Sequence, residues 1–441
     1  MSEWMRGSLG ELASGVRGVS YTPNQLQRFM SPETVVLLRS NNIKGGQVNF
    51  DNVQLVPSHI VSNEQLAQHG DTAVCMSNGS KALVGKSGRI EGNEAPCTVG
   101  AFCSIFRPHT HADEKFVSYI FQSGAYRRHL DIILAGSAIN NLRNSDVEAL
   151  SLEIPPRQEQ RLIAHILDTL DSQIQKTEAL IAKLEKVKEG LLHDLLTRGI
   201  DENGQLRPSP EQAPELYKES PLGLIPISWH FAALGSLLDK IEAGKSPSCP
   251  DIPAPSGEWG VLKVSAVNPK GFRSTENKVV ERKSLVVEGY EVKQGDLLIT
   301  RANTPDLVGA SCIVEEWTSR LMLSDKTLRL VENPDLVMRQ YIYHSLQQSY
   351  VRKQISIAAT GTSMSMKNIS QGAIRTLSII VPPIAEQSAI CKRVAAISKR
   401  ISHEQSKVSK LYQDKAGLMD DLLTGRVRVT PLIDQAQATP A

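Results

Sequence analysis

Two short segments of the chain end like a phosphate-binding loop. Gly85–Ser87 and Gly244–Ser246 both carry the glycine, lysine and hydroxyl residue that hold nucleotide phosphates and a magnesium ion. Such a loop also needs a glycine five residues before its Gly-Lys pair, so that backbone amides can surround the phosphates. Ser80 and Asp239 stand at that position. We therefore interpret both segments as basic, flexible loops without a bound nucleotide.

Residues that bind metals or act as nucleophiles also lack their usual companions. His109 and His111 follow Cys103 closely in sequence, but no second pair of ligands has the spacing of a zinc site. The chain contains no Gly-x-Ser-x-Gly turn for a serine nucleophile and no Asn-Pro-Pro-aromatic pocket like that of amino-methyltransferases. We expect a chain with no catalytic residue, no metal and no cofactor of its own.

Length and composition are those of an ordinary globular protein. The 441 residues are 41% hydrophobic and 22% charged, which allows about two to four domains. The 49 Lys and Arg against 47 Asp and Glu give a net charge of +2, so contact with nucleic acid would need local patches or a partner. The six cysteines form no C-x-x-C pair, and no stretch approaches about 18 apolar residues. We expect a soluble, cytoplasmic protein with reduced thiols.

The most informative feature is an internal repeat. Trp4 returns as Trp229 and Asn78 returns as Asn303, both 225 residues later. Positions 155 to 199 match positions 382 to 426 without a gap, and 15 of these 45 positions are identical. The chain is therefore a tandem duplication. Each copy consists of a mixed domain of about 150 residues followed by one long helix.

Each helix carries the seam of a coiled coil. Apolar residues recur at alternating spacings of four and three, and eight of ten positions are apolar in both copies. A Pro-Pro pair sets each helix start, and about 40 residues at ~1.5 Å each give a rod of about 60 Å, too long to bury its stripe on its own domain. The polar exceptions, Thr177, Lys188, Glu404 and Lys415, can fix the register. We expect the helices to pair along Ile163, Leu167, Leu170, Ile174, Ile181, Leu184, Leu191, Leu195, Ile390, Val394, Ile397, Ile401, Val408, Leu411, Leu418 and Leu422.

These features predict an α+β fold in which the two helices pair as an antiparallel coiled coil with pseudo-two-fold symmetry. The segment from 201 to 222 has four prolines among polar residues, so we expect a connector outside the cores. The expected parts are a first mixed domain at 1–154, a helix at 155–200, the connector at 201–222, a second mixed domain at 223–381, a helix at 382–428 and a tail at 429–441.

Pseudo-two-fold symmetry suits duplex DNA. Dimeric DNA readers place equivalent elements about 34 Å apart, one helical turn along the duplex. The two mixed domains have diverged far more than the two helices. A covalent pseudo-dimer of this kind would read two different half-sites separated by a spacer that it does not read.

Together the motifs resemble the specificity (S) subunits of type I restriction-modification systems. The resemblance covers essentially the whole chain, although the first copy lacks a counterpart of Leu224–Pro226 and has Met76 where the second has Arg301. The motifs that carry it are Tyr217–Pro226 before Trp229 and Leu234–Gly235, Gly295–Arg301, Gly361–Thr362 running to Asn368–Ile369, the Pro-Pro-x-x-Glu-Gln helix starts at 155 and 382, and the Asp-Leu-Leu-Thr helix ends at 194 and 421.

The resemblance implies a division of labour. Two target-recognition domains each read one half of a split, asymmetric DNA site, and the paired helices act as spacer and docking surface. Two methyltransferase (M) subunits bring S-adenosylmethionine and methylate adenine N6, and restriction (R) subunits use ATP and magnesium. This chain would be a non-catalytic part of that complex.

Candidate DNA contacts are basic or amide side chains in the Gly-rich loops of the two domains. Arg suits guanine, Asn suits adenine, and Lys mostly contacts phosphates. The candidates are Lys44, Asn78, Lys81, Lys86 and Arg89 in the first domain, and Lys245, Lys263, Arg301, Asn303, Lys326 and Lys367 in the second.

Two functions of other classes stay open. The chain is also compatible with a coiled-coil scaffold that joins two ligand-binding domains and has no salt-dependent affinity for DNA. A diverged nuclease or methyltransferase would turn over without a partner, but the missing nucleotide and metal motifs argue against it.

Overall fold

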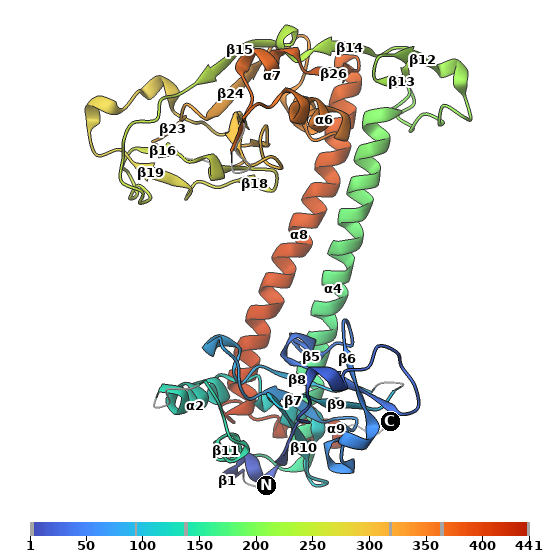
Figure 1. Cartoon of the computed structure of the whole chain (residues 1–441), viewed down its shortest axis with the longest axis vertical. Helices are drawn as coiled ribbons and strands as arrows, with labels where there is room; N and C mark the ends of the chain where they lie inside the picture. The colour runs from blue at the N-terminus through green and yellow to red at the C-terminus, as the bar shows by residue number, and fades with distance from the viewer. Residues whose placement is uncertain (1–3, 93–94, 136–139, 317–319, 362–365, 439–441) are drawn as a thin grey trace. The chain divides into compact units, whose positions relative to one another are not determined.

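The computed structural model describes residues 4–92, 95–135, 140–316, 320–361 and 366–438. Thr362, one of the residues of the resemblance, lies outside this part. The chain forms two compact units, Met1–Leu180 with Glu404–Ala441, and Ile181–His403. Each unit holds one mixed domain and part of the long helices α4 (Arg157–Thr197) and α8 (Ile384–Leu423), which Figure 1 shows in green and red.

The first domain has two sheets. Val35 to Leu38 are all buried in the central strand of the smaller sheet, as expected for an apolar run that has neighbours on both edges. The larger sheet has the order β2 (Ala13–Arg17), β10 (Cys103–Pro108), β7 (Thr72–Cys75), β8 (Ser87–Arg89), β5 (Gly46–Val48), β4 (Ile43–Lys44), and the smaller β6 (Gln54–Pro57), β3 (Thr34–Leu38), β9 (Cys97–Val99).

Helices and one further strand pair complete this domain. Phe106, Phe116 and Tyr119 are almost fully buried and form the centre of its core. The helices are α1 (Glu114–Ile120), α2 (Gly124–Ala135) and α3 (Asn144–Glu148), and β1 (Met5–Ser8) pairs with β11 (Ser151–Ile154).

The second domain is built from the same kinds of element. Its main sheet has the order β15 (Leu238–Ala243), β24 (Thr327–Glu332), β20 (Leu297–Thr300), β22 (Ser311–Ile313), and a second has β19 (Asn277–Val279), β16 (Gly260–Leu262), β23 (Leu321–Met322). The shorter pairs are β17 (Val267–Asn268) with β18 (Gly271–Phe272), β21 (Ala302–Asn303) with β25 (Lys367–Asn368), and β14 (His230–Ala233) with β26 (Ser378–Val381). The helices are α5 (Arg339–Leu346), α6 (Ser349–Ala358) and α7 (Gln371–Thr376).

The two domains have the same strand topology. β3 runs parallel to β9 and antiparallel to β6, and β16 likewise runs parallel to β23 and antiparallel to β19. β10 lies between β2 and β7, just as β24 lies between β15 and β20. The α+β class and the tandem duplication are thus confirmed.

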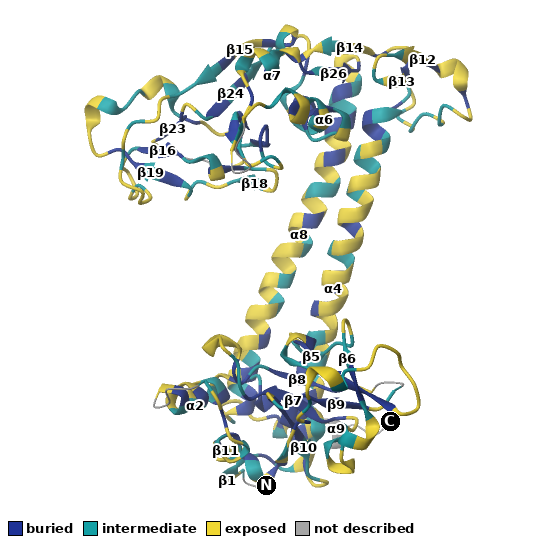
Figure 2. Ribbon diagram, viewed as in Figure 1, coloured by how far each residue is buried: buried dark blue, intermediate teal, exposed yellow. Residues whose placement is uncertain are grey.

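Within each unit the two long helices share a hydrophobic core. In the first unit Leu167 of α4 and Leu422 of α8 belong to one cluster, and in the second unit Leu195 and Val394 do. Lys415 Nζ lies 2.6 Å from Asp171 Oδ1 and Tyr412 Oη donates to Glu178 at 2.8 Å. Position numbers rise along α4 as they fall along α8, so the pairing inside the first unit is antiparallel. The apolar seam residues are all buried or half-buried (Figure 2).

A Glu-Gln pair ties each helix start to its domain. Gln160 Oε1 accepts a hydrogen bond from Asp113 N and Gln387 Oε1 accepts one from Met338 N, both at 2.8 Å. The two amide Nε2 groups also donate at 2.9 Å to the proline carbonyls that precede each helix. Both side chains are buried with their polar atoms satisfied, which is the condition for burial at low cost.

The preceding glutamates contact a tryptophan in each unit. Trp4 Nε1 donates to Glu159 at 3.1 Å and Trp229 Nε1 donates to Glu386 at 2.9 Å. An arginine after the end of the other long helix also pairs with each carboxylate, at 3.5 Å from Arg428 in the first unit and 3.0 Å from Arg207 in the second. Each domain is therefore held by the start of one helix and the end of the other.

The connector and the tail are more ordered than their composition suggests. Tyr217 and Ile225 are buried, and they lie in a hairpin of β12 (Tyr217–Ser220) and β13 (Gly223–Pro226). Its prolines stand at turns and strand ends, where a missing amide hydrogen costs little. Within the expected connector, 201–222, Ala213 and Tyr217 are buried, and the other residues are exposed or half-buried. The end of the chain forms α9 (Thr430–Ala438), preceded by the buried Val429.

Candidate nucleic-acid interface

Three chain segments meet at one end of each main sheet. In the first domain β2 and β7 finish at this end and β10 begins there, because β10 is antiparallel to both. In the second domain β15 and β20 finish and β24 begins in the same way. We call this place the loop end, formed by segments 18–23, 76–78 and 100–102 in the first domain and by 244–248, 301–303 and 323–326 in the second.

Matching backbone hydrogen bonds hold the two loop ends. Phe102 O accepts from Met76 N at 2.8 Å, and Lys326 O accepts from Arg301 N at 2.9 Å. Met76 O in turn accepts from Leu142 N, and Arg301 O from Ile369 N, both at 2.8 Å. The register therefore equates Met76 with Arg301 and Phe102 with Lys326.

A glycine makes the close approach of these segments possible. A Cβ on Gly18 would lie 2.3 Å from Gly100 O, and one on Gly244 would lie 1.8 Å from Leu323 O. Any side chain at either position would push the first segment of the loop end away from the third.

The loop ends share amides and differ in their other side chains. Asn78 and Asn303 occupy the same register position. Asn141, which bridges to Ser77, is likewise equivalent to Asn368, which pairs with Ala302. Beside these amides the first domain has Met76, Phe102 and Asn140 where the second has Arg301, Lys326 and Lys367. The second loop end is therefore basic, whereas the first has a buried Met76, a half-buried Asn140 and an exposed Phe102.

The structure brings most candidates of the second domain together. Arg301, Asn303, Lys326 and Lys367 all lie at or beside the loop end. Lys245 is exposed in the neighbouring segment, where the next residue, Ser246, donates to Asp325. Lys263 lies after β16, and its Nζ is 2.6 Å from Asp251.

The candidates of the first domain separate into two groups. Asn78 lies at the loop end, Lys81 is exposed three residues beyond it, and Lys86 Nζ donates to Ser40 O at 3.4 Å. Lys44 is exposed on β4, which forms the far edge of the sheet from β2.

Arg89 belongs to the attachment of the domain to the helices. Its guanidinium is buried, and Nη1 lies 3.1 Å from Asp168 of α4. Burial tends to lower the pKa of Arg89, but its contacts with Glu91 and Asp168 outweigh that effect and raise it. A buried, doubly paired arginine is held in place by the protein, so we exclude Arg89 from the interface.

Asp168 is the centre of this attachment. It accepts hydrogen bonds from Tyr119 Oη and Lys115 Nζ, both at 2.6 Å. Burial would raise the pKa of Asp168, but Lys115, Tyr119 and Arg89 together lower it. Tyr119 Oη also lies 2.7 Å from Asp171 Oδ2, and Asp171 pairs with Lys415 of α8.

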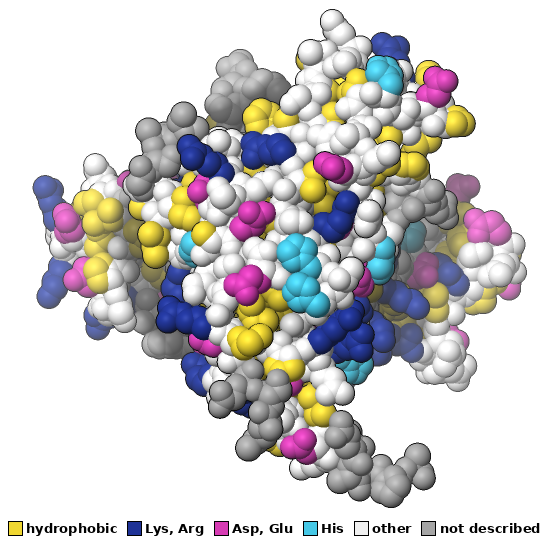
Figure 3. All heavy atoms as spheres, turned by 90° about the horizontal axis from the view of Figure 1, so that it is seen from below, with side chains coloured by type: hydrophobic (Ala, Val, Ile, Leu, Met, Phe, Trp, Pro, Cys, Tyr) yellow, Lys and Arg dark blue, Asp and Glu magenta, His cyan; other side chains and the backbone are white. Residues whose placement is uncertain are grey.

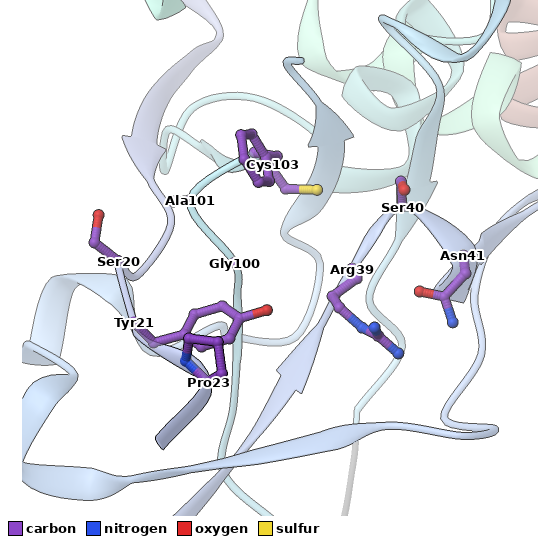
Figure 4. Close-up of a pocket in the computed structure, with 10 residues that line it drawn as sticks. Ser20, Tyr21, Pro23, Arg39, Ser40, Asn41, Gly100, Ala101 and Cys103 are labelled. Atoms are coloured by element: carbon purple, nitrogen blue, oxygen red, sulfur yellow. The ribbon is translucent and has the colours of Figure 1, made fainter. Parts of the chain in front are cut away.

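A pocket at the loop end of the first domain was missed by sequence reasoning. It has a volume of about 490 Å³ and is lined by Ser20, Tyr21, Pro23, Arg39, Ser40, Asn41, Gly100, Ala101, Phe102 and Cys103. Figure 4 shows Tyr21 and Pro23 on one side of it, Arg39 on the other, and the segment from Gly100 to Cys103 between them. One sign of this pocket is that both domains have a basic residue at an equivalent place. Arg39 and Lys263 directly precede the short 3-10 turns that follow β3 and β16.

Charges on the first unit are mixed. Figure 3 shows Lys and Arg side chains interspersed with Asp, Glu and His across the middle of the face that it presents. This pattern agrees with the net charge of +2. In the part of the chain that the structure describes, no group of three His, Cys, Asp or Glu residues is arranged to hold a metal ion. None of the described helices is long and apolar enough to cross a membrane.

The molecule thus consists of two domains of one topology, each with a loop end whose side chains differ, and each packed on the long helices α4 and α8. The sequence model of the type I restriction modification DNA specificity domain matches residues 1–186. The chain is similar to type I restriction-modification specificity (S) subunits, both in this match and in its curated relatives.

The relatives extend over most of the chain. The StySPI specificity subunit of Salmonella potsdam is 24% identical over 93% of this chain and 87% of that protein. The EcoKI specificity subunit of Escherichia coli is 26% identical over the same shares, 93% and 87%. The EcoEI specificity subunit of Escherichia coli is 33% identical, over 50% of this chain and 37% of that protein.

Solved structures agree on the fold. A chain from a study of complex assembly and conformational transition of the type I R-M system has a TM-score of 0.56 at 15% identity, covering 97% of this chain and 99% of that one. A type I S subunit from M. genitalium has a TM-score of 0.55 at 14% identity, covering 95% and 96%.

Proposed function

We propose that this chain is the DNA-specificity subunit of a type I restriction-modification complex and reads a split, asymmetric site. One half-site contacts the loop end of the first domain, and the other contacts that of the second. The observation that carries the proposal is the substitution of Met76, Phe102 and Asn140 by Arg301, Lys326 and Lys367 within one backbone frame.

Base-specific contacts require side chains held by a fixed backbone. Arg301 meets this condition, because its N donates to Lys326 O at 2.9 Å and its O accepts from Ile369 N at 2.8 Å. An arginine held in this way suits the two acceptors of guanine, and a nearby asparagine such as Asn303 suits adenine. Lys326 and Lys367 would mainly neutralise phosphates.

The chemistry belongs to the partners under this proposal. The chain itself would be non-catalytic and would dock two M subunits, which carry S-adenosylmethionine, and R subunits, which use ATP and magnesium. The exposed faces of α4 and α8 supply surface for such docking (Figure 2). A net charge of +2 leaves much of the phosphate contact to those partners.

Modification-sensitive sequencing of genomic DNA tests the proposal. The M subunit is expressed with the intact chain, without it, and with an Arg301→Ala variant. We expect one split methylated motif that disappears without the chain and becomes degenerate in one half with the variant. If the M subunit is shown to be active and the methylation pattern is the same with and without the chain, the proposal is refuted. That result would favour the coiled-coil scaffold with two ligand-binding domains.

A further inference from the structure

Phe102 is a rigidly held aromatic residue in solvent. Its side chain is 70% exposed. The backbone around it is fixed, because Gly100 N donates to Leu38 O at 2.9 Å and Cys103 N donates to Gly100 O at 2.8 Å. Its own carbonyl accepts from Met76 N. These hydrogen bonds fix the position of the backbone from which the exposed ring extends.

The surface beside Phe102 is apolar with one polar group. Tyr21 and Pro23 line the same pocket, and Arg39 forms its opposite wall (Figure 4). Arg39 Nε is buried and has no hydrogen-bond partner among the described residues. Contact with a ligand here would remove aromatic surface from water and leave Arg39 next to it.

The second domain has a different residue type at the position of Phe102. Lys326 stands where Phe102 stands, with the same backbone hydrogen bond from the preceding strand. In the major groove a lysine finds acceptors on guanine or phosphate, whereas the apolar group that a phenylalanine can contact is the 5-methyl of thymine.

We propose that Phe102 contacts the 5-methyl group of a thymine in the half-site read by the first domain. This inference rests on the proposed function. It makes Phe102 a specificity-determining residue and predicts that this half-site contains at least one A·T pair whose methyl group is recognised. The second half-site has no such requirement through the equivalent position, because Lys326 occupies it.

Replacing thymine by deoxyuridine tests the contact, because uracil pairs identically but lacks the methyl group. The complex of the full chain with its M subunits is titrated with duplexes in which each thymine of the first half-site is replaced in turn. Burial of one methyl group is worth about 0.8 kcal/mol, or roughly four-fold. We expect one position at which deoxyuridine weakens binding about three- to ten-fold.

Two variants assign the effect to Phe102. Phe102→Ala should weaken binding of the thymine duplex by a similar factor and should bind thymine and deoxyuridine duplexes equally. Lys326→Ala, the matched variant in the second domain, should weaken binding but keep the thymine preference. Since Phe102 is exposed, its replacement should leave thermal unfolding unchanged, which shows that the variant folds.

The outcomes separate the inference from the function beneath it. If the complex is sequence-specific but no deoxyuridine position matters, or if Phe102→Ala still prefers thymine, the inference is overturned and the proposed function stands. A first half-site that contains no A·T pair would likewise overturn the inference and leave the proposed function standing. If the complex shows no sequence preference at all, both fail.

Discussion

Arg301 and Met76 show how side chains can differ within a shared backbone frame. Met76 is fully buried, whereas Arg301 is half-buried, so the same position belongs to the core in one domain and is partly exposed in the other. The difference arises from the side chain alone, because the backbone hydrogen bonds on both sides are the same.

Removal of this arginine should relax specificity. We expect Arg301→Ala to cost about 1–3 kcal/mol of specific binding and to relax discrimination at one base pair of the second half-site. Lys326→Ala should weaken binding to all sequences more evenly and reduce its salt dependence. Binding titrations at several salt concentrations check both, with Lys283→Ala, an exposed residue between β19 and β20, as the control. An equal loss on all sequences for Arg301→Ala would contradict a base contact.

His344 in α5 gives the second unit a dependence on pH. Burial, and then the charge of Lys188, lower the pKa of His344 from 6.5 to about 4. Because the folded-state pKa lies below the ordinary value, folding favours the neutral ring. The stability from this residue is therefore complete above about pH 6.5 and is lost as the pH falls through 4.

Chemical denaturation at several pH values between about 7.5 and about 4.5 checks this prediction, because a free histidine titrates in roughly this range. We expect His344→Gln to lower stability at neutral pH and to flatten its decline below pH 6.5. A variant with the same decline as the parent would show that other groups cause it.

At the scale of elements, the two helix starts make a matched pair of experiments. Gln160→Ala and Gln387→Ala each leave a part-buried backbone amide without its acceptor, which costs about 1–3 kcal/mol. Since the two residues lie in different units, the losses should add in the double variant. Calorimetry with Gln158→Ala, exposed in the first turn of α4, as the control checks this, and strong non-additivity would contradict it.

The helix ends offer a second matched pair. Gly199 and Gly425 have φ of +68° and +72°, and a Cβ would lie 2.3 Å from Trp229 Cζ2 and 2.9 Å from Trp4 Cζ3. Alanine at either position should therefore destabilise its unit by about 2 kcal/mol or more. Gly190 and Gly417 lie inside the helices with nothing within 4 Å of an added Cβ, so alanine there should stabilise by up to about 1 kcal/mol. Thermal unfolding of the four variants should show these opposite signs, and equal signs would refute the reasoning.

For the whole molecule, duplication predicts independent half-sites. A loop-end variant in one domain should change only the half of the site which that domain reads, because the two loop ends lie in separate compact units. Combining Phe102→Ala with Arg301→Ala should change both halves, with additive losses of binding free energy. Methylome sequencing of the single and double variants checks this. A single variant that alters both halves would contradict independent reading.

The sequence by itself determined the duplication, the long helices and their seam. These features follow from local periodicity and from self-similarity, which a linear pattern records completely. The helix starts at 155 and 382 were also visible, because Pro-Pro-x-x-Glu-Gln fits the first turn of a helix. In the connector, by contrast, the high proline content gave no indication that Tyr217 is buried.

Only the tertiary structure decided which loops form a site. Phe102, Arg39 and Tyr21 share no periodicity in the sequence. Pairing of β10 with β2 brings Tyr21 towards Phe102, and pairing of β3 with β9 brings Arg39 to the same pocket. Arg89 and Lys326 are equally basic in the sequence, but strand pairing buries one against Asp168 and leaves the other at the loop end. Long-range pairing is set by packing of the whole domain, so residue type alone could not distinguish a structural charge from a recognition charge.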